Sequence, residues 1–155
     1  MTMSAATGPL TRFPTASGGI TRLALERLRC ASIAVAPLLR QAGLRATQVE
    51  NPDARLSVAS QIEFLEGSAD ALDDSLLGFH LAQDFELRRI GLLYFVLASS
   101  DTLIEALKRA ERYGRVVNEA ISLQCAAGPD LRIRLSMSAC RVIPIGSRSS
   151  SSSPP

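Results

Sequence analysis

The chain has 155 residues, of which 46% are hydrophobic and 21% are charged, a balance typical of a soluble globular protein with one core. Its formal net charge of +2 is too small to indicate nucleic-acid binding by itself, because phosphate binding needs a clustered basic surface. Tryptophan is absent and aromatic residues make up only 5%, so we expect an aliphatic core.

The first 19 residues are rich in glycine, proline, serine and threonine and predict a disordered lead-in. They lack the apolar segment of an export signal, and no apolar run reaches the roughly 20 residues of a membrane span. The three cysteines are widely spaced and belong to no CxxC or Cys/His cluster, which predicts neither a disulfide framework nor a zinc site. We therefore expect a cytoplasmic protein without a cofactor.

Helical patterns follow in chain order. Leu23, Leu25 and Leu28 indicate one short helix. A second helix is expected over residues 35–42, and Gly43 is well placed to end it in a left-handed conformation.

A longer helix is predicted over residues 58–72, after turn chemistry at residues 51–53 and with Ser57 as its N-cap. Its expected apolar face consists of Val58, Ile62, Leu65, Ala69 and Leu72. Another short helix is expected after Asp74 or Ser75. The apolar stretch over residues 90–99 is either a buried helix or a buried strand, and periodicity does not separate the two.

The clearest helix comes next, with Ser100 or Asp101 as its expected cap. Its predicted buried stripe consists of Leu103, Leu107, Ala110, Gly114 and Val117. Two acid–base pairs at i,i+4 spacing mark its solvent side, Glu105 with Arg109 and Glu111 with Arg115.

The period then changes to two, and "AISLQC" and "LRIRLS" predict strands with Leu131, Ile133 and Leu135 on a buried face. A lone hairpin is marginal in water, so the sheet is expected to be incomplete. Residues 142–145 are a candidate edge strand, and residues 146–155 predict a disordered Ser/Pro tail. The predicted fold class is α+β, predominantly α-helical: a bundle of short helices followed by a β-hairpin from an incomplete sheet.

The order of these elements resembles the N-terminal effector domain of AraC/XylS-type transcription regulators, in the subgroup labelled arabinose-binding. The resemblance runs from about Ala42 to Ser136 and is carried by "LLRQAGL", "NPDARLSVASQIEFLEGSADALDDSLLGFHLAQDF", "IGLLYFVLASSDTLIEALKRAERYGRVVNEAISL" and "LRIRLS". It implies a partial effector domain over residues 20–145, in a regulator whose C-terminal helix-turn-helix pair binds promoter DNA. The sequence departs from the pattern after about Ser136, which predicts a truncated regulator without its DNA-binding half.

Five residues are candidates for contacting an effector: His80, Tyr94, Phe95, Arg112 and Tyr113. A plainer interpretation is favoured for most of them. His80 fits a partly buried helix position, Tyr94 and Phe95 fit the core, and the basic run around Arg112 fits a solvated helix face. Catalytic triads, metal clusters and phosphate loops are not visible in the sequence, which predicts no catalytic residue, no metal site and no enzyme.

Residues 58–82 have the spacing of a helix-turn-helix, but they carry acidic residues and almost no lysine or arginine, so we expect no DNA binding there. The sequence therefore predicts the ligand-sensing and dimerisation part of an AraC-family regulator. Its expected partners are a small-molecule effector and a second copy or a related regulator, with DNA bound only through the missing domain and no membrane. The alternative is a stand-alone helical protein–protein interaction module that pairs with an intact regulator.

Overall fold

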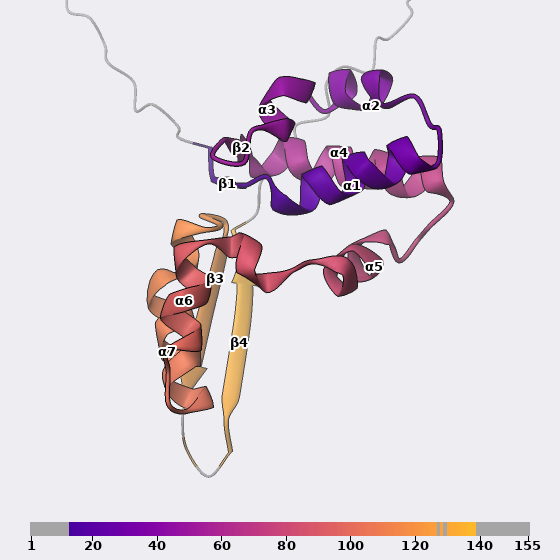
Figure 1. Ribbon diagram of the computed structural model, residues 1–155. Coiled ribbons are helices and arrows are strands. Elements are labelled where there is room, and N and C mark those ends of the chain that lie inside the picture. The colour runs from indigo at the N-terminus through magenta and orange to yellow at the C-terminus, as the bar shows by residue number, and fades with distance from the viewer. Residues whose placement is uncertain (1–12, 127, 129, 139–155) are drawn as a thin grey trace, which may run out of the picture.

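The computed structural model describes residues 13–126, 128 and 130–138 of the chain (Figure 1). They form an α+β fold that is mostly helical, as predicted. An N-terminal helical part is joined through a 3-10 turn to a C-terminal part, in which two helices pack on a hairpin (Figure 1). The lead-in before residue 13, the candidate strand at 142–145 and the Ser/Pro tail lie outside the described residues.

The N-terminal part buries most of the core. Its elements are β1 (Thr15–Ser17), α1 (Gly19–Cys30), α2 (Val35–Gln41), α3 (Ala46–Glu50), β2 (Arg55–Ser57), α4 (Val58–Leu72) and α5 (Leu77–Asp84). Helix α4 packs against α1, α2 and α5, and Phe64, Leu25 and Leu28 meet with at most 1% of their surface exposed. Gly43 has φ +66° after α2, so the predicted left-handed helix end is confirmed.

The predicted disordered lead-in over residues 1–19 is wrong at its end, because residues 15–17 form strand β1. Ala16 pairs with Leu56 of β2 in an antiparallel register, and α1 begins at Gly19. On its other side β1 receives a bridge between Ala16 and Asn118. The strand exists because both of its edges are paired by residues far away in sequence, which local composition does not reveal.

Helix α4 forms where it was predicted, but its most buried face is rotated. The buried residues are Val58, Gln61, Phe64 and Ser68. Of the predicted stripe, Ile62, Leu65, Ala69 and Leu72 are only partly buried, because α1, α2 and α5 cover the neighbouring face. Ser57 occupies the N-cap position, although its side chain makes no capping hydrogen bond.

The apolar stretch after α5 is helical, which settles the open choice between helix and strand. It consists of a 3-10 turn, η1 (Leu87–Ile90), and the short helix α6 (Leu92–Ala98). The expectation that it is buried is wrong. None of its residues is fully buried, and Leu92 and Phe95 are 79% and 63% exposed, because α7 covers one side of α6 only.

Helix α7 (Leu103–Tyr113) is followed by the 3-10 turn η2 (Gly114–Val116). Its cap is Thr102, whose hydroxyl accepts a hydrogen bond from the Glu105 N–H, and not the predicted Ser100 or Asp101. The predicted buried stripe of α7 is only partly covered, and Leu103, its first member, is 69% exposed.

The two predicted salt bridges of α7 do not form among the described residues, and in the first pair both side chains bond to local groups instead. The Glu105 carboxylate accepts from the Asp101 N–H. The Arg109 guanidinium donates to the Val96 carbonyl at 2.9 Å and to the Ser99 hydroxyl at 2.8 Å, which ties α7 to the end of α6.

The predicted hairpin is confirmed as β3 (Ile121–Ala126) and β4 (Arg132–Met137), paired antiparallel with Leu123 opposite Leu135. The expected buried face of β4 is wrong, because α7 packs on β3 and leaves β4 open. Ile133 and Leu135 are 53% and 67% exposed. Among the helices that the structure describes, none is both long and apolar enough to cross a membrane.

Candidate effector groove

A groove of about 470 Å³ lies where the N-terminal and C-terminal parts meet. Its volume falls within the range of small-molecule sites in proteins. The described residues that line it are Ala16, Ser17, Gly19, Ile20, Val58, Gln61, Ile62, Leu65, Ala82, Phe85, Leu87, Ile90, Val117, Asn118, Ile121 and Met137. We call it the inter-part groove. Because its walls come from β1, α1, α4, α5, η1, β3 and β4, it exists only when both parts are folded and in contact.

Gly19 shapes one wall of the inter-part groove at the start of α1. A Cβ atom at this position would lie 2.9 Å from Cε2 of Phe85, closer than such atoms approach one another. The missing side chain therefore lets the Phe85 ring come close to α1 and line the groove.

Gln61 is a buried polar residue of the wall, with 8% of its surface exposed. Its Oε1 accepts from the Thr21 hydroxyl at 2.7 Å, and its Nε2 lies 3.3 Å from the carbonyl oxygens of both Ala16 and Leu56. One side chain thus ties α4 to α1, β1 and β2. These bonds satisfy the amide from within the protein, so Gln61 holds the wall in shape.

The two parts are joined beside the groove by backbone hydrogen bonds from β1. The Ser17 N–H donates to the Val117 carbonyl at 2.9 Å, and the Glu119 N–H donates to the Thr15 carbonyl at 3.0 Å. Strand β1 therefore lies between β2 and residues 117–119. This arrangement fixes the distance between the groove walls that Ala16 and Val117 contribute.

A smaller hollow of about 250 Å³ adjoins the groove on the side of α7 and the hairpin. The two share Ile90, Val117, Asn118 and Ile121 in their linings. Asn118 therefore stands where the two hollows meet. Its side-chain Oδ1 accepts from the Ala120 N–H at 3.0 Å, which orients the amide.

Comparison with known proteins identifies the family. Residues 33–148 match the family described as the arabinose-binding domain of AraC transcription regulators, N-terminal, and this match covers most of the chain. The chain belongs to this family. A comparison with curated proteins found no match. The match continues to residue 148, so the expectation that the family pattern ends near Ser136 is wrong.

The AraC-family match contains every groove residue from Val58 to Met137. Ala16, Ser17, Gly19 and Ile20 line the same groove but lie before the matched range. The family's own segment therefore supplies most of the groove, and β1 with the first turn of α1 completes one wall.

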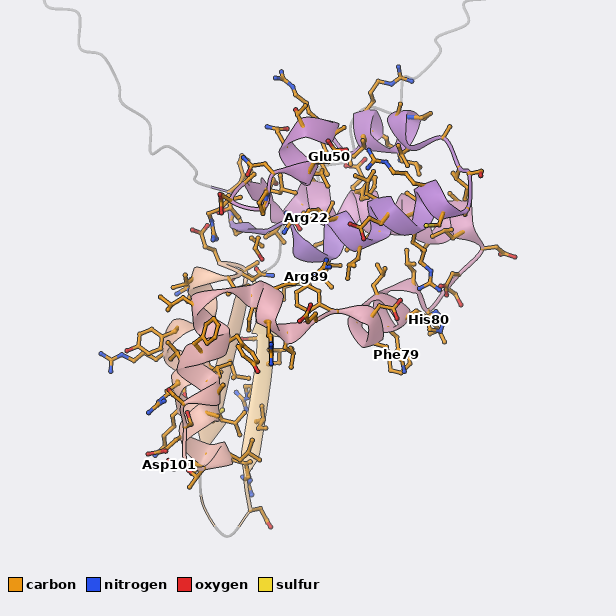
Figure 2. All side chains as sticks on the ribbon, viewed as in Figure 1. Arg22, Glu50, Phe79, His80, Arg89 and Asp101 are labelled. Atoms are coloured by element: carbon orange, nitrogen blue, oxygen red, sulfur yellow. The ribbon has the colours of Figure 1, made fainter. Side chains whose placement is uncertain are left out.

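The predicted effector contact His80 lies outside the groove. Its Nδ1 is 2.8 Å from Oδ2 of Asp74, and Figure 2 shows His80 and Phe79 on the side of α5 that faces away from the hairpin in this view. The hydrogen bond with His80 is the main cause that lowers the pKa of the Asp74 carboxyl, and the Leu76 N–H contributes as well. The pair closes the turn before α5.

The other four candidates also lie outside the groove lining. Tyr94 and Phe95 meet edge to face on α6, with ring centroids 5.4 Å apart, and the Arg88 guanidinium lies 5.9 Å from the Tyr94 ring. Arg112 lies over the neighbouring Tyr113 ring at 5.3 Å, on the exposed end of α7. The structure therefore does not gather the five predicted residues into one site.

The groove residues that sequence reasoning missed carry weak signals of their own. Ile62 and Leu65 belong to the predicted apolar face of α4, and helical spacing does not show that part of this face lines a groove. Asn118 and Glu119 form a short polar step between the apolar residues Val117 and Ala120, and nothing else in the sequence marks Asn118. Within the described residues, histidine, cysteine and acidic side chains form no cluster of three that a metal ion needs.

Proposed function

We propose that this chain is the effector-sensing part of an AraC-type transcription regulator, acting in the cytoplasm, and that its effector binds in the inter-part groove. The description of the family names arabinose, and we carry over to this chain only the binding of a small molecule. The observation that carries the proposal is a groove of ligand size whose walls come from both parts.

A ligand in this groove bridges elements that otherwise meet mainly at β1. It contacts α4 and α5 on one side and Val117, Ile121 and Met137 on the other. A ligand that prefers one arrangement of the two parts shifts the population toward it, by as much as its affinities for the two arrangements differ. This is a physical route from effector binding to a changed surface for partners.

Thermal unfolding of the whole chain with a library of small metabolites tests the proposal. At 100 times its Kd, a ligand that binds only the folded state stabilises it by about 2.7 kcal/mol, which is a clear rise in Tm. Ala82→Phe places a ring at a solvent-exposed groove position, and Ala71→Phe adds the same ring at an exposed position of α4 outside the groove. A compound that stabilises the wild type and Ala71→Phe, but not Ala82→Phe, supports the proposal.

Two other outcomes of this screen contradict the proposal. A library that leaves Tm unchanged argues against sensing. A compound that stabilises Ala82→Phe as strongly as the wild type binds somewhere other than the groove.

A pairing function is the second candidate, and the open apolar surfaces favour it. Leu92 and Phe95 of α6 and Leu135 and Met137 of β4 are each at least 62% exposed. Apolar surface of this kind is typical of sites where another protein binds. Self-association, or pairing with a related regulator, is tested by sedimentation of the chain alone and in a mixture with such a regulator; a chain that stays monomeric in both contradicts it.

DNA contact is not part of the function proposed for α4 and α5. Their surface carries Glu63, Glu66, Asp70 and Asp73 and repels a phosphate backbone. Salt-resistant, sequence-specific retention of promoter DNA by this chain would contradict this statement.

A further inference from the structure

The lining of the inter-part groove restricts the class of effector, an inference that rests on the proposed function. Among the described lining residues, Ser17, Gln61 and Asn118 have polar side chains. Gly19 has no side chain, and the remaining lining residues are apolar. We propose that the groove takes an uncharged, largely apolar molecule with a single hydrogen-bond acceptor, such as a ketone, ether or ester, rather than a sugar or an ion.

The polar groups that remain for a ligand are few. Gln61 already bonds to Thr21, Ala16 and Leu56, so a ligand that took its amide would leave buried groups unpaired. Ser17 is solvent-exposed at the edge of the groove. Asn118 is thus the principal polar group for recognition.

Asn118 offers mainly a donor, because its oxygen already accepts one hydrogen bond. Its Oδ1 is occupied by the Ala120 N–H, which also fixes which end of the amide is oxygen. Among the described residues, the structure shows no partner for its Nδ2. Because Asn118 lines both hollows, an acceptor atom near the middle of an apolar ligand meets this donor while the two ends of the ligand occupy apolar space.

A free sugar fits this lining poorly. Each hydroxyl group that enters the groove loses its bonds to water, and the two available side chains replace only a few of them. Phe85 is the single aromatic ring among the described lining residues, so stacking surface for a sugar ring is also limited. The apolar lining therefore favours a ligand with few hydroxyl groups.

An ionic ligand fits poorly for a related reason. The described lining of the larger groove contains no charged side chain that would compensate a buried charge. Glu111 and Arg115 line the smaller hollow, but they are exposed and of opposite sign, and the Glu111 carboxylate accepts from the Cys125 N–H. Together they give no net attraction for either sign of ion.

Displacement of an uncharged fluorescent probe, N-phenyl-1-naphthylamine, tests the proposal with a matched set of competitors. We expect 2-octanone to displace the probe at concentrations at least about tenfold lower than octanoate or octylammonium, because burial without a partner penalises the charged forms. L-Arabinose is expected not to displace the probe. Ala82→Phe should weaken probe binding by about tenfold or more, and Ala71→Phe should leave it unchanged.

Asn118→Asp is the sharper variant, because it has nearly the same shape and keeps an oxygen for the Ala120 N–H. It removes the donor and adds a negative charge. We expect 2-octanone to compete about fivefold less well and octylammonium to compete better than with the wild type. If 2-octanone and octylammonium compete with the variant as they do with the wild type, Asn118 does not contribute to ligand recognition.

The outcomes separate this inference from the proposed function. The ligand class is overturned if arabinose, octanoate or octylammonium binds the wild type more tightly than 2-octanone does. If that compound also loses affinity in Ala82→Phe, the groove remains the sensing site. Probe binding that is absent, or equal in the wild type and Ala82→Phe, overturns both.

Discussion

The Arg55 guanidinium and the Glu119 carboxylate lie 3.7 Å apart, and both hold Thr15 on the strand between them. Arg55 donates to the Thr15 hydroxyl and carbonyl, each at 2.9 Å, and to the Val116 carbonyl at 2.6 Å. Glu119 accepts from the Thr15 N–H at 2.9 Å and from its hydroxyl at 3.0 Å. These three residues join β2, β1 and the segment between η2 and β3 beside the groove.

Replacement of Arg55 by alanine is expected to loosen this junction. The lost bonds come from a charged group, but 39% of the Arg55 side chain is exposed, so we expect a loss of about 1–2 kcal/mol in the free energy of unfolding. Urea unfolding measures it. Arg40→Ala removes an exposed arginine of α2 and should change stability little. Equal effects of the two substitutions would contradict the structural role of Arg55.

The hydrogen bond between Thr21 and Gln61 gives a second prediction. Thr21 is fully buried, and Thr21→Val keeps its shape but leaves Gln61 Oε1 without its donor. We expect a loss of about 1–3 kcal/mol, the typical cost of an unpaired buried polar group. Thr47→Val, at an exposed threonine of α3, is the matched control. Thermal or urea unfolding that does not distinguish the two variants would contradict the buried position of this pair.

Phe64 and Phe79 give a matched comparison of buried and exposed rings. Phe64 has no exposed surface, and 61% of Phe79 is exposed. Phe64→Ala should cost about 3–5 kcal/mol and Phe79→Ala less than about 0.5 kcal/mol, because only the first leaves a cavity. Comparison of the two unfolding midpoints checks the packing of α4 directly. The prediction fails if Phe79→Ala proves the more damaging.

The sequence predicted the longer helices well because their signals are local. The apolar spacing of α1, α4 and α7, and Gly43 after α2, all act within a few residues along the chain. Strands β1 and β2 were not predicted. Each has three residues, and they pair with each other and with Asn118 across long stretches of sequence. The signal for such strands lies in their partners rather than in their own composition.

The candidate site was less predictable than the fold. The groove brings together residues near Ala16, Ile62, Phe85 and Asn118, which have no common spacing in the sequence. His80, the most conspicuous candidate, pairs with Asp74 outside the groove. The all-round apolar composition of α6 predicted a buried segment, because composition does not show which neighbouring elements are present to cover it.

Acid should weaken the protein partly through Asp74. In the folded protein its pKa is lowered below the usual 3.8, chiefly by the hydrogen bond with His80. A lowered pKa contributes stability that is present at pH values above the usual pKa of 3.8. This stability is lost as the pH falls through the pKa that Asp74 has in the folded protein. We expect the urea concentration at the unfolding midpoint of the wild type to decrease once the pH is below about 4. The decrease should be smaller for Asp74→Asn. Asp70→Asn, which removes an exposed carboxyl of α4, is the matched control, and equal urea midpoints of the two variants at low pH would contradict this prediction.

The exposed apolar residues of the C-terminal part should control solubility. Leu92 begins α6 and Leu103 begins α7, and they are 79% and 69% exposed. Substitution of both by glutamine removes apolar surface without removing core, so the soluble concentration should rise and the free energy of unfolding should change by less than about 0.5 kcal/mol. Light scattering and urea unfolding measure the two quantities.

The control for this variant is Leu81→Gln, because Leu81 is 1% exposed in α5. Burial of an unpaired amide there should cost about 3 kcal/mol or more. A large loss of stability from the Leu92 and Leu103 substitutions would contradict the prediction, since it would mean that these side chains are buried in solution. Sedimentation of the wild type would then show whether a second copy of the chain covers them.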